Sequence, residues 1–175
     1  MGKEIVDREI YYSRLRAAIH TRDQLQSDMM IIARTDAAQK YGFDEAMERL
    51  EEAVKIGVDI VFFEALKSKE EAKEVCQIMG NVPVLLNMVP GGTTPDMTVE
   101  EARELGFRII IFPAICLSAV ATSVGNALDD LQGERGVPQS NGHTGVKSLF
   151  NICGLQDCIE LDKKAGGQAY ADIGK

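Results

Sequence analysis

The chain has 175 residues, which suits one domain, and its 45% hydrophobic and 26% charged residues are typical of a folded globular protein. Asp and Glu (27) outnumber Lys and Arg (19), so with a net charge of -8 nucleic-acid and membrane-surface partners are not expected. The first ten residues carry mixed charge and no apolar stretch of the kind found in signal peptides, and no run reaches the roughly 18 apolar residues of a membrane span. We therefore expect a cytoplasmic protein.

Four short apolar runs along the chain predict strands of a parallel sheet. Each run is nearly continuous rather than alternating, as in strands that are buried on both faces, and each is followed by a polar or helical stretch. The runs begin roughly 25 residues apart, which is the period of a βα unit. They span residues 29–33, 58–63, 82–88 and 107–112.

Helical patterns separate these predicted strands. A helix over 43–55 places apolar side chains on one face at steps of three and four residues, and Gly57 ends it. Ser68 and Thr98 each precede a stretch with two glutamates in its first turn, which is the pattern of a helix N-cap. The other predicted helices span 7–24, 116–131 and 149–164, the last interrupted at Gly154, with a loop over 133–145.

Four βα units fill about half of a closed (β/α)8 barrel, which typically needs about 250 residues. The sequence leaves two α/β architectures open: the C-terminal half of a barrel with open edges, or a doubly wound sheet of the flavodoxin type. Strand order distinguishes them, because barrel strands follow one another and doubly wound sheets reverse. We expect a partial barrel over 1–135 and a C-terminal loop and helix over 136–175 that packs between subunits.

Polar side chains close three of the four predicted strands, at the edge where parallel sheets bind ligands. Arg34 offers a planar fork of donors for a carboxylate, although an ion pair with Asp36 or Glu64 is the alternative. Glu64 interrupts an apolar segment and needs a partner there. Asn87 offers both a donor and an acceptor, for a ligand or for a loop cap. Together they predict a substrate site.

A Gly- and Pro-rich loop over 89–95 follows the third predicted strand. Its Gly92 would let the backbone approach a ligand closely, and Thr94 stands two residues later, although an ordinary turn is the alternative. The loop lacks the Lys-Ser/Thr pair of a phosphate-binding loop. The four cysteines show neither metal-pair nor disulfide spacing, and we expect them to be reduced and mostly buried.

The strand-end segments resemble the isocitrate lyase and phosphoenolpyruvate mutase superfamily. The first motif, Ile-Ile-Ala-Arg-Thr-Asp-Ala, is specific when it is combined with the glutamate and asparagine strands. The tail is similar to the branch that contains methylisocitrate lyase, dimethylmalate lyase and oxaloacetate hydrolase. The segments that carry the resemblance are 31–37, 59–65, 83–88, 92–95, 106–113 and 149–167.

This resemblance implies a (β/α)8 barrel that binds Mg²⁺ and a small 2-oxo or hydroxy carboxylate. It implies that a carbon–carbon bond is cleaved or a bond at phosphorus is rearranged, through an enolate that a metal and an arginine stabilise. By position, Arg34, Glu64 and Asn87 match substrate-binding residues of the superfamily, with Gly92 and Thr94 in a loop near the substrate.

The sequence also departs from the superfamily pattern. The resemblance places the Mg²⁺ carboxylates and a Lys-x-Cys-Gly-His gating segment before the residues that match Gly2, so no residue of this chain is predicted to bind the metal and none is assigned as catalytic. We expect a lyase-type chain that is inactive alone. The alternative is an interaction or regulatory protein, which forms a homo-oligomer or assembles with a full-length relative.

Overall fold

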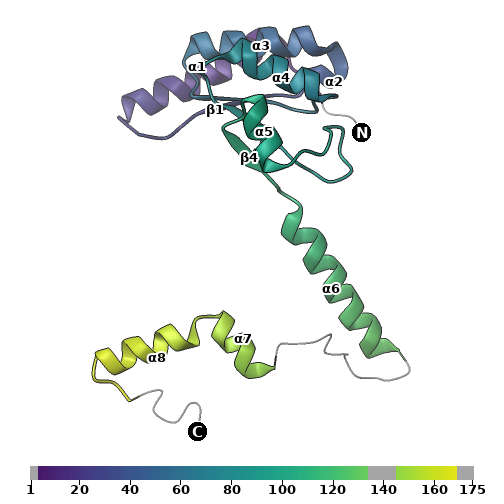
Figure 1. Ribbon diagram of the computed structural model, residues 1–175. Helices are drawn as coiled ribbons and strands as arrows, with labels where there is room; N and C mark the ends of the chain where they lie inside the picture. The colour runs from purple at the N-terminus through teal and green to yellow at the C-terminus, as the bar shows by residue number, and fades with distance from the viewer. Residues whose placement is uncertain (1–3, 134–144, 169–175) are drawn as a thin grey trace. The chain divides into compact units, whose positions relative to one another are not determined.

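The computed structural model describes residues 4–133 and 145–168. The chain divides into two compact units, one up to Ala119 and one from Val120 onward. The first unit contains all of the strands in the described part of the chain and is shown in Figure 1. The expected division after residue 135 stays a prediction, and most of the expected loop over 133–145 lies outside the described residues.

The four strands form one parallel sheet in the order β1-β2-β3-β4. Consecutive strands are neighbours, as in a (β/α)8 barrel, and the order does not reverse as it does in a doubly wound sheet. The flavodoxin-type alternative is therefore wrong. The strands are β1 (Ile32–Thr35), β2 (Ile60–Phe63), β3 (Val84–Asn87) and β4 (Ile109–Ile111).

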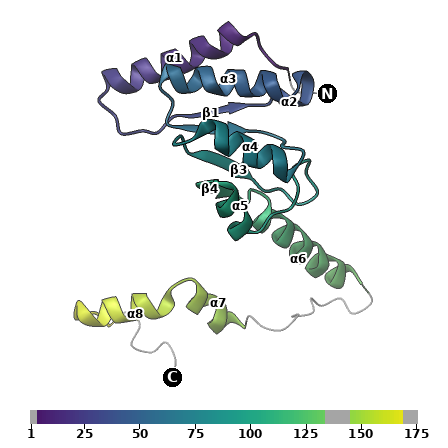
Figure 2. The same cartoon turned by 45° about the horizontal axis from the view of Figure 1, so that its top comes forward.

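Helices alternate with the strands and cover one face of the sheet. Figure 2 shows α1 and α3 beside β1, with α4 beside β3, and α3 packs on both β1 and β2. We call the helix-covered face the outer face and the opposite one the inner face. The helices of this unit are α1 (Arg8–Gln24), α2 (Ala38–Tyr41), α3 (Phe43–Ile56), α4 (Lys69–Met79) and α5 (Val99–Leu105).

Each face of the sheet has its own apolar cluster. Val61, Phe63 and Leu86 project outward and belong to the main core that the helices complete. Phe62 and Leu85 project inward with Ile60, and they form a smaller cluster that Ile109 flanks. Because successive side chains of a strand point to opposite faces, the nearly continuous apolar runs of the sequence serve both clusters.

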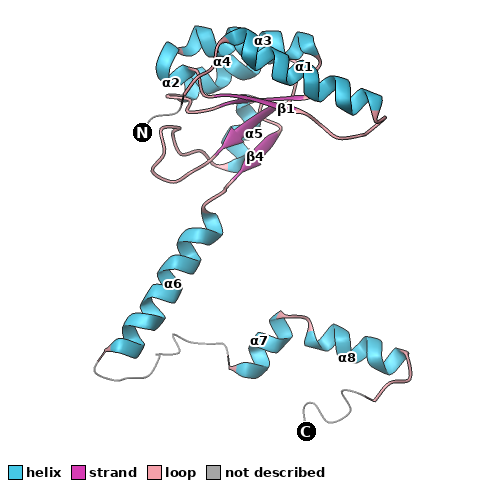
Figure 3. Cartoon of the chain, turned by 180° about the vertical axis from the view of Figure 1, so that it is seen from behind, coloured by secondary structure: helices cyan, strands magenta, loops and turns pink. Residues whose placement is uncertain are grey.

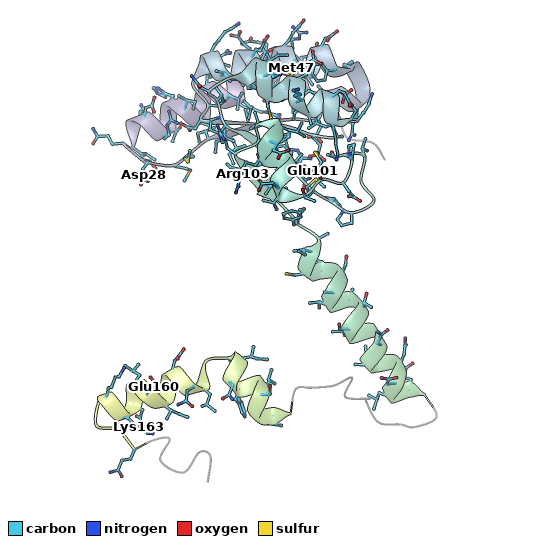
Figure 4. All side chains as sticks on the ribbon, in the orientation of Figure 1. Asp28, Met47, Glu101, Arg103, Glu160 and Lys163 are labelled. Atoms are coloured by element: carbon cyan, nitrogen blue, oxygen red, sulfur yellow. The ribbon has the colours of Figure 1, made fainter. Side chains whose placement is uncertain are left out.

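The helix boundaries follow the predicted capping residues. The Thr98 hydroxyl accepts a hydrogen bond from the Glu101 N–H, and the Glu101 carboxylate accepts one from the Thr98 N–H, which completes a capping box. Glu101, labelled in Figure 4, also binds Lys69 Nζ of α4 at 2.7 Å. Ser68 caps α4 by accepting a hydrogen bond from the Glu71 N–H. The α3 helix ends at Gly57, which has a left-handed φ of 112°.

The first strand begins three residues later than the sequence predicts. Met29 and Met30, which are 65% and 60% exposed, precede it. At Ile31 the backbone N–H donates to Asp59 Oδ2 at 2.7 Å, and Arg22 Nη1 donates to the same oxygen at 2.8 Å. The pairing of β1 with β2 starts at this point, so the apolar run before it remains outside the sheet.

The C-terminal part is helical, and Figure 3 shows its helices in cyan. The segment predicted as one interrupted helix is two, which meet around Gly154 with its left-handed φ of 85°. None of the residues of α6 is buried. The helices are α6 (Ile115–Gln132), which crosses the boundary between the units, α7 (Val146–Ile152) and α8 (Leu155–Lys164).

The expectation that most cysteines are buried is wrong. Only Cys76 is buried, within the outer-face core, and burial raises the pKa of its thiol to about 11. Cys116, Cys153 and Cys158 are exposed in this chain, and all four thiols are free. These three cysteines lie on or beside the C-terminal helices α6, α7 and α8.

Candidate functional site

The C-terminal ends of the first three strands bring Arg34, Glu64 and Asn87 into contact. Arg34 pairs in register with Phe62, and Glu64 follows two residues later on the same inner face. Arg34 Nη2 lies 3.2 Å from Glu64 Oε2, and Asn87 Nδ2 donates to that same oxygen at 3.4 Å. The three side chains therefore form one connected cluster, as the sequence predicted from strand-end positions.

Arg34 is held on one edge of its guanidinium by carboxylates. Its Nε and Nη2 donate to the two oxygens of Asp36 at 2.9 Å and 3.0 Å, a bidentate pair. Hydrogen bonding to Asp36 raises the pKa of Arg34, so the guanidinium stays charged. The ion pairs that the sequence offered as the alternative are thus present. Within residues 4–133 and 145–168, Arg34 Nη1 has no hydrogen-bond partner, and its two N–H groups remain available to a ligand.

Glu64 and Asn87 are mostly shielded from solvent. The Glu64 N–H donates to the Thr35 carbonyl at 3.1 Å, which extends the β1–β2 pairing by one residue. Asn87 Oδ1 is buried and has no hydrogen-bond partner in the described part of the chain. The amide cannot simply be reversed, because Oδ1 would then face the Glu64 carboxylate. An unpaired buried acceptor is costly, so this oxygen is suited to a donor from a ligand.

A pocket of about 240 Å³ opens beside Glu64 and Asn87. Gly92 and Thr94, the predicted loop residues, line it, although Arg34 does not and instead lines a neighbouring hollow with Asp36 and Thr35. A Cβ on residue 92 would lie 2.9 Å from the Val89 carbonyl oxygen, so only glycine fits there. The complete lining is Gln39, Glu64, Ala65, Asn87, Val89, Gly92, Thr93 and Thr94.

Gln39 is a pocket residue that sequence reasoning missed. It lies on the four-residue helix α2, which the sequence analysis did not predict. The available signal was its position in the loop after β1, since loops after parallel strands supply ligand contacts. Gln39 therefore lines the pocket from the connection after β1, and Thr93 lines it from the loop after β3.

The described residues do not make a metal centre. No group of three or more His, Cys, Asp or Glu side chains is placed there to hold a metal ion. Asp36 and Glu64 come close together, but both bind Arg34. Mg²⁺ needs about six oxygen ligands, with carboxylates free to bind it, so these two residues do not fit a magnesium site by themselves.

No helix in the described ranges is long and apolar enough to span a bilayer. Within the same ranges α6 is the longest helix, and its 18 residues include two aspartates.

The sequence is similar to known lyases. The 2-methylisocitrate lyase of Aeropyrum pernix is 40% identical over 118 residues, which cover 67% of this chain and 37% of that protein. The 2,3-dimethylmalate lyase of Eubacterium barkeri is 40% identical over 113 residues, or 65% of this chain and 38% of that protein. The chain thus matches well under two thirds of the length of these relatives.

Solved structures agree with the sequence matches. A crystal structure of 2,3-dimethylmalate lyase, described as a PEP mutase/isocitrate lyase superfamily member, aligns with a TM-score of 0.87 at 40% identity, over 99% of this chain and 57% of that one. Oxaloacetate acetylhydrolase bound to 3,3-difluorooxalacetate aligns with a TM-score of 0.86 at 41% identity, over 96% and 56%. The expected partial-barrel α/β fold and the superfamily resemblance are confirmed.

The family model for phosphoenolpyruvate phosphomutase matches residues 1–132, which include every strand of the described sheet and the whole strand-end cluster. The chain therefore belongs to the phosphoenolpyruvate phosphomutase family.

Proposed function

We propose that this chain supplies the carboxylate-binding part of a carbon–carbon lyase that acts on a small 2-oxo or hydroxy carboxylate. The observation that carries the proposal is the Arg34–Glu64–Asn87 cluster, which leaves the Asn87 oxygen buried and unpaired at the strand ends. The names of the related lyases, which act on 2-methylisocitrate and 2,3-dimethylmalate, support this class of substrate.

Each residue of the cluster has a role that its geometry supports. The two N–H groups of Arg34 Nη1 donate charge-assisted hydrogen bonds to a substrate carboxylate, because the Nε and Nη2 fork is already engaged by Asp36. Glu64 accepts a hydrogen bond from a substrate hydroxyl, and Asn87 Oδ1 accepts a second one. Gly92 and Thr94 border the rest of the substrate from the loop after β3.

The charge of the cluster limits what it does alone. One guanidinium lies between two carboxylates, which neutralise its charge. A substrate carboxylate at Nη1 therefore gains less Coulomb attraction than it would from an arginine without such neighbours. We therefore expect the chain alone to bind such ligands weakly and to turn them over far more slowly than a complete relative does.

A turnover assay tests this expectation. The purified chain is incubated with Mg²⁺ and 2-methylisocitrate, 2,3-dimethylmalate or oxaloacetate, beside a complete lyase of the family. We expect product formation at least a hundredfold slower than by the complete enzyme. Turnover at a comparable rate would contradict the proposed inactivity of the chain alone, while leaving the substrate class supported.

A binding measurement tests the site itself. Oxalate is titrated while backbone amide signals are followed by NMR, and we expect the largest shifts at Glu64, Asn87 and Gly92. The Arg34→Ala variant should lose these shifts. Arg16→Ala is the matched control, because Arg16 is an exposed arginine that pairs with Glu9. Shifts of equal size in both variants would refute the assignment of Arg34.

A second candidate function is self-association through the sheet edges. β1 and β4 stand at the two ends of the described sheet, and Ile32 and Ile111 on its inner face are 44% and 36% exposed. Unpaired edges and apolar side chains favour a partner, and two four-stranded sheets supply the eight strands of a closed barrel. Sedimentation velocity at micromolar concentration should show a dimer, and a monodisperse monomer would refute this candidate.

A further inference from the structure

Phe62 lies directly beneath the guanidinium of Arg34. It is on β2, next to Arg34 in the strand register, and its ring centroid is 4.7 Å from Arg34 Cζ. Phe62 is only 6% exposed, so its ring is a fixed surface within the inner-face cluster. The next residue, Phe63, points to the outer face, where its ring lies 5.3 Å from that of Phe43.

The contacts of Arg34 divide into two kinds. Asp36 and Glu64 hold the Nε and Nη2 edge, which fixes the group within its own plane. The Phe62 ring lies beneath the guanidinium carbon and restricts tilting of the group through a cation–π interaction. A ring consumes no N–H donor, whereas a further carboxylate would. Phe62 therefore supports the guanidinium and leaves the Nη1 edge open to a ligand.

We propose that Phe62 is a positioning residue for Arg34 and that its ring sets the affinity of the site for a carboxylate. The orientation of Arg34 depends only on the observed contacts, while the effect on affinity rests on the function proposed above. Asp36 and Glu64 alone would leave the guanidinium free to tilt about the edge that they hold.

Neighbouring phenylalanines provide a matched experiment. Phe62→Leu removes the ring on the inner face, and Phe63→Leu removes a ring of equal size from the outer face. Phe62→Tyr restores an aromatic face and serves as the rescue variant. If Phe62→Leu fails to fold, Phe62→Met removes the ring with a flexible side chain of similar volume.

The first readout is the NMR signal of Arg34 Nε–H, which is assigned by its absence in Arg34→Lys. The ring current of Phe62 should shift this signal in the wild type and in Phe62→Tyr. The shift should disappear in Phe62→Leu and persist in Phe63→Leu. An Nε–H signal that is unmoved by Phe62→Leu, or moved equally by Phe63→Leu, would overturn the proposal whether or not any ligand binds.

The second readout is the affinity for oxalate. We expect the dissociation constant to rise about three- to fivefold in Phe62→Leu, to recover in Phe62→Tyr and to stay unchanged in Phe63→Leu. An unchanged affinity in Phe62→Leu would refute the link between the ring and the ligand. If the wild type binds no oxalate while the Nε–H signals behave as expected, the proposed function fails and the positioning role of Phe62 stands.

Discussion

The two faces of the four-stranded sheet differ in the side chains that they carry. The outer face is covered by helices, and its side chains, such as Val61, Phe63 and Leu86, are apolar and almost fully buried. The inner face is apolar along most of its length but ends in Arg34 and Asn87. The charged and amide side chains of the strands thus lie at the C-terminal end of the inner face, where parallel sheets bind ligands.

The largest effect that separates the faces is expected for Leu86→Ala. Leu86 is 2% exposed on the outer face, and the cavity left in the core should lower the free energy of unfolding by about 3 kcal/mol. Urea denaturation measures this change. Ile78→Ala, at an exposed position of α4, is the control and should change stability by less than about 0.5 kcal/mol. Similar losses would mean that the outer face is not closely packed.

Gly106→Ala tests how closely the helices of the outer layer pack. Gly106 has φ of 113°, and an added Cβ would lie 2.9 Å from the Cβ of Cys76. We expect a loss of about 2 kcal/mol from backbone strain and overlap. Gly57→Ala is the control, because Gly57 has a similar φ of 112° but an added Cβ would lie 3.8 Å from Ile19 Cγ2, which leaves room for it. Equal losses in thermal or urea unfolding would show that the Cys76 contact contributes nothing.

Glu45→Gln tests the ion pairs that join α1 to α3 outside the outer face. Hydrogen bonding from Arg8, and also from Arg49, lowers the pKa of Glu45 from 4.5 to about 2. The folded-state pKa lies below the unfolded one, so this stabilisation is present above about pH 4.5 and is lost as the pH falls toward 2. We expect the variant to lose about 1 kcal/mol at pH 7.

The pH profile distinguishes this pair from a generic charge effect. The unfolding free energy of Glu45→Gln should vary less between pH 5 and pH 2 than that of the wild type, by roughly the 1 kcal/mol lost at neutral pH. Glu9→Gln, which affects an exposed ion pair with Arg16, is the control and should leave the profile unchanged. Parallel profiles for wild type and Glu45→Gln would contradict the assignment.

The smallest change in stability is expected at the inner face, for Asn87→Leu. The substitution removes a buried oxygen that has no partner and one long hydrogen bond to Glu64 of 3.4 Å. The gain from removing the unpaired oxygen nearly cancels the loss of the hydrogen bond, so stability should stay within about 0.5 kcal/mol while the oxalate-induced shifts disappear. Asn87→Ala, which leaves a cavity, should cost about 1 kcal/mol. A large loss in Asn87→Leu would show that Asn87 is structural.

The parallel strands and most helices could be predicted because their determinants are local. Apolar runs define the strands, and Thr98 and Gly57 mark helix ends through their own side chain or backbone freedom. The start of β1 could not be predicted, because it depends on Asp59, which is 28 residues from Ile31. The short helix α2 has no apolar periodicity that would reveal it.

The cluster could be predicted because parallel strands end at one edge of the sheet. The residues that surround the members of the cluster could not be predicted. Phe62 reads as one of several apolar residues, and only the register of β1 with β2 places its ring under Arg34. Gln39 reads as an exposed polar residue, and only the folding of the loop after β1 brings it to the pocket. Which residues contact Arg34 or line the pocket depends on how distant segments pack, and the periodicity of the sequence does not give this information.

The hydrogen bonds of Asp59 have a consequence at the far end of β2. The strand reads Ile-Val-Phe-Phe and is buried on both faces. Sliding it by one position would place one phenylalanine where the other stood, and all side chains within the strand would still be apolar. That slide would nevertheless turn Glu64 toward the helices and leave Arg34 without its neighbour. By accepting hydrogen bonds from Ile31 and Arg22, the Asp59 carboxylate before the strand favours the register in which Glu64 emerges on the inner face.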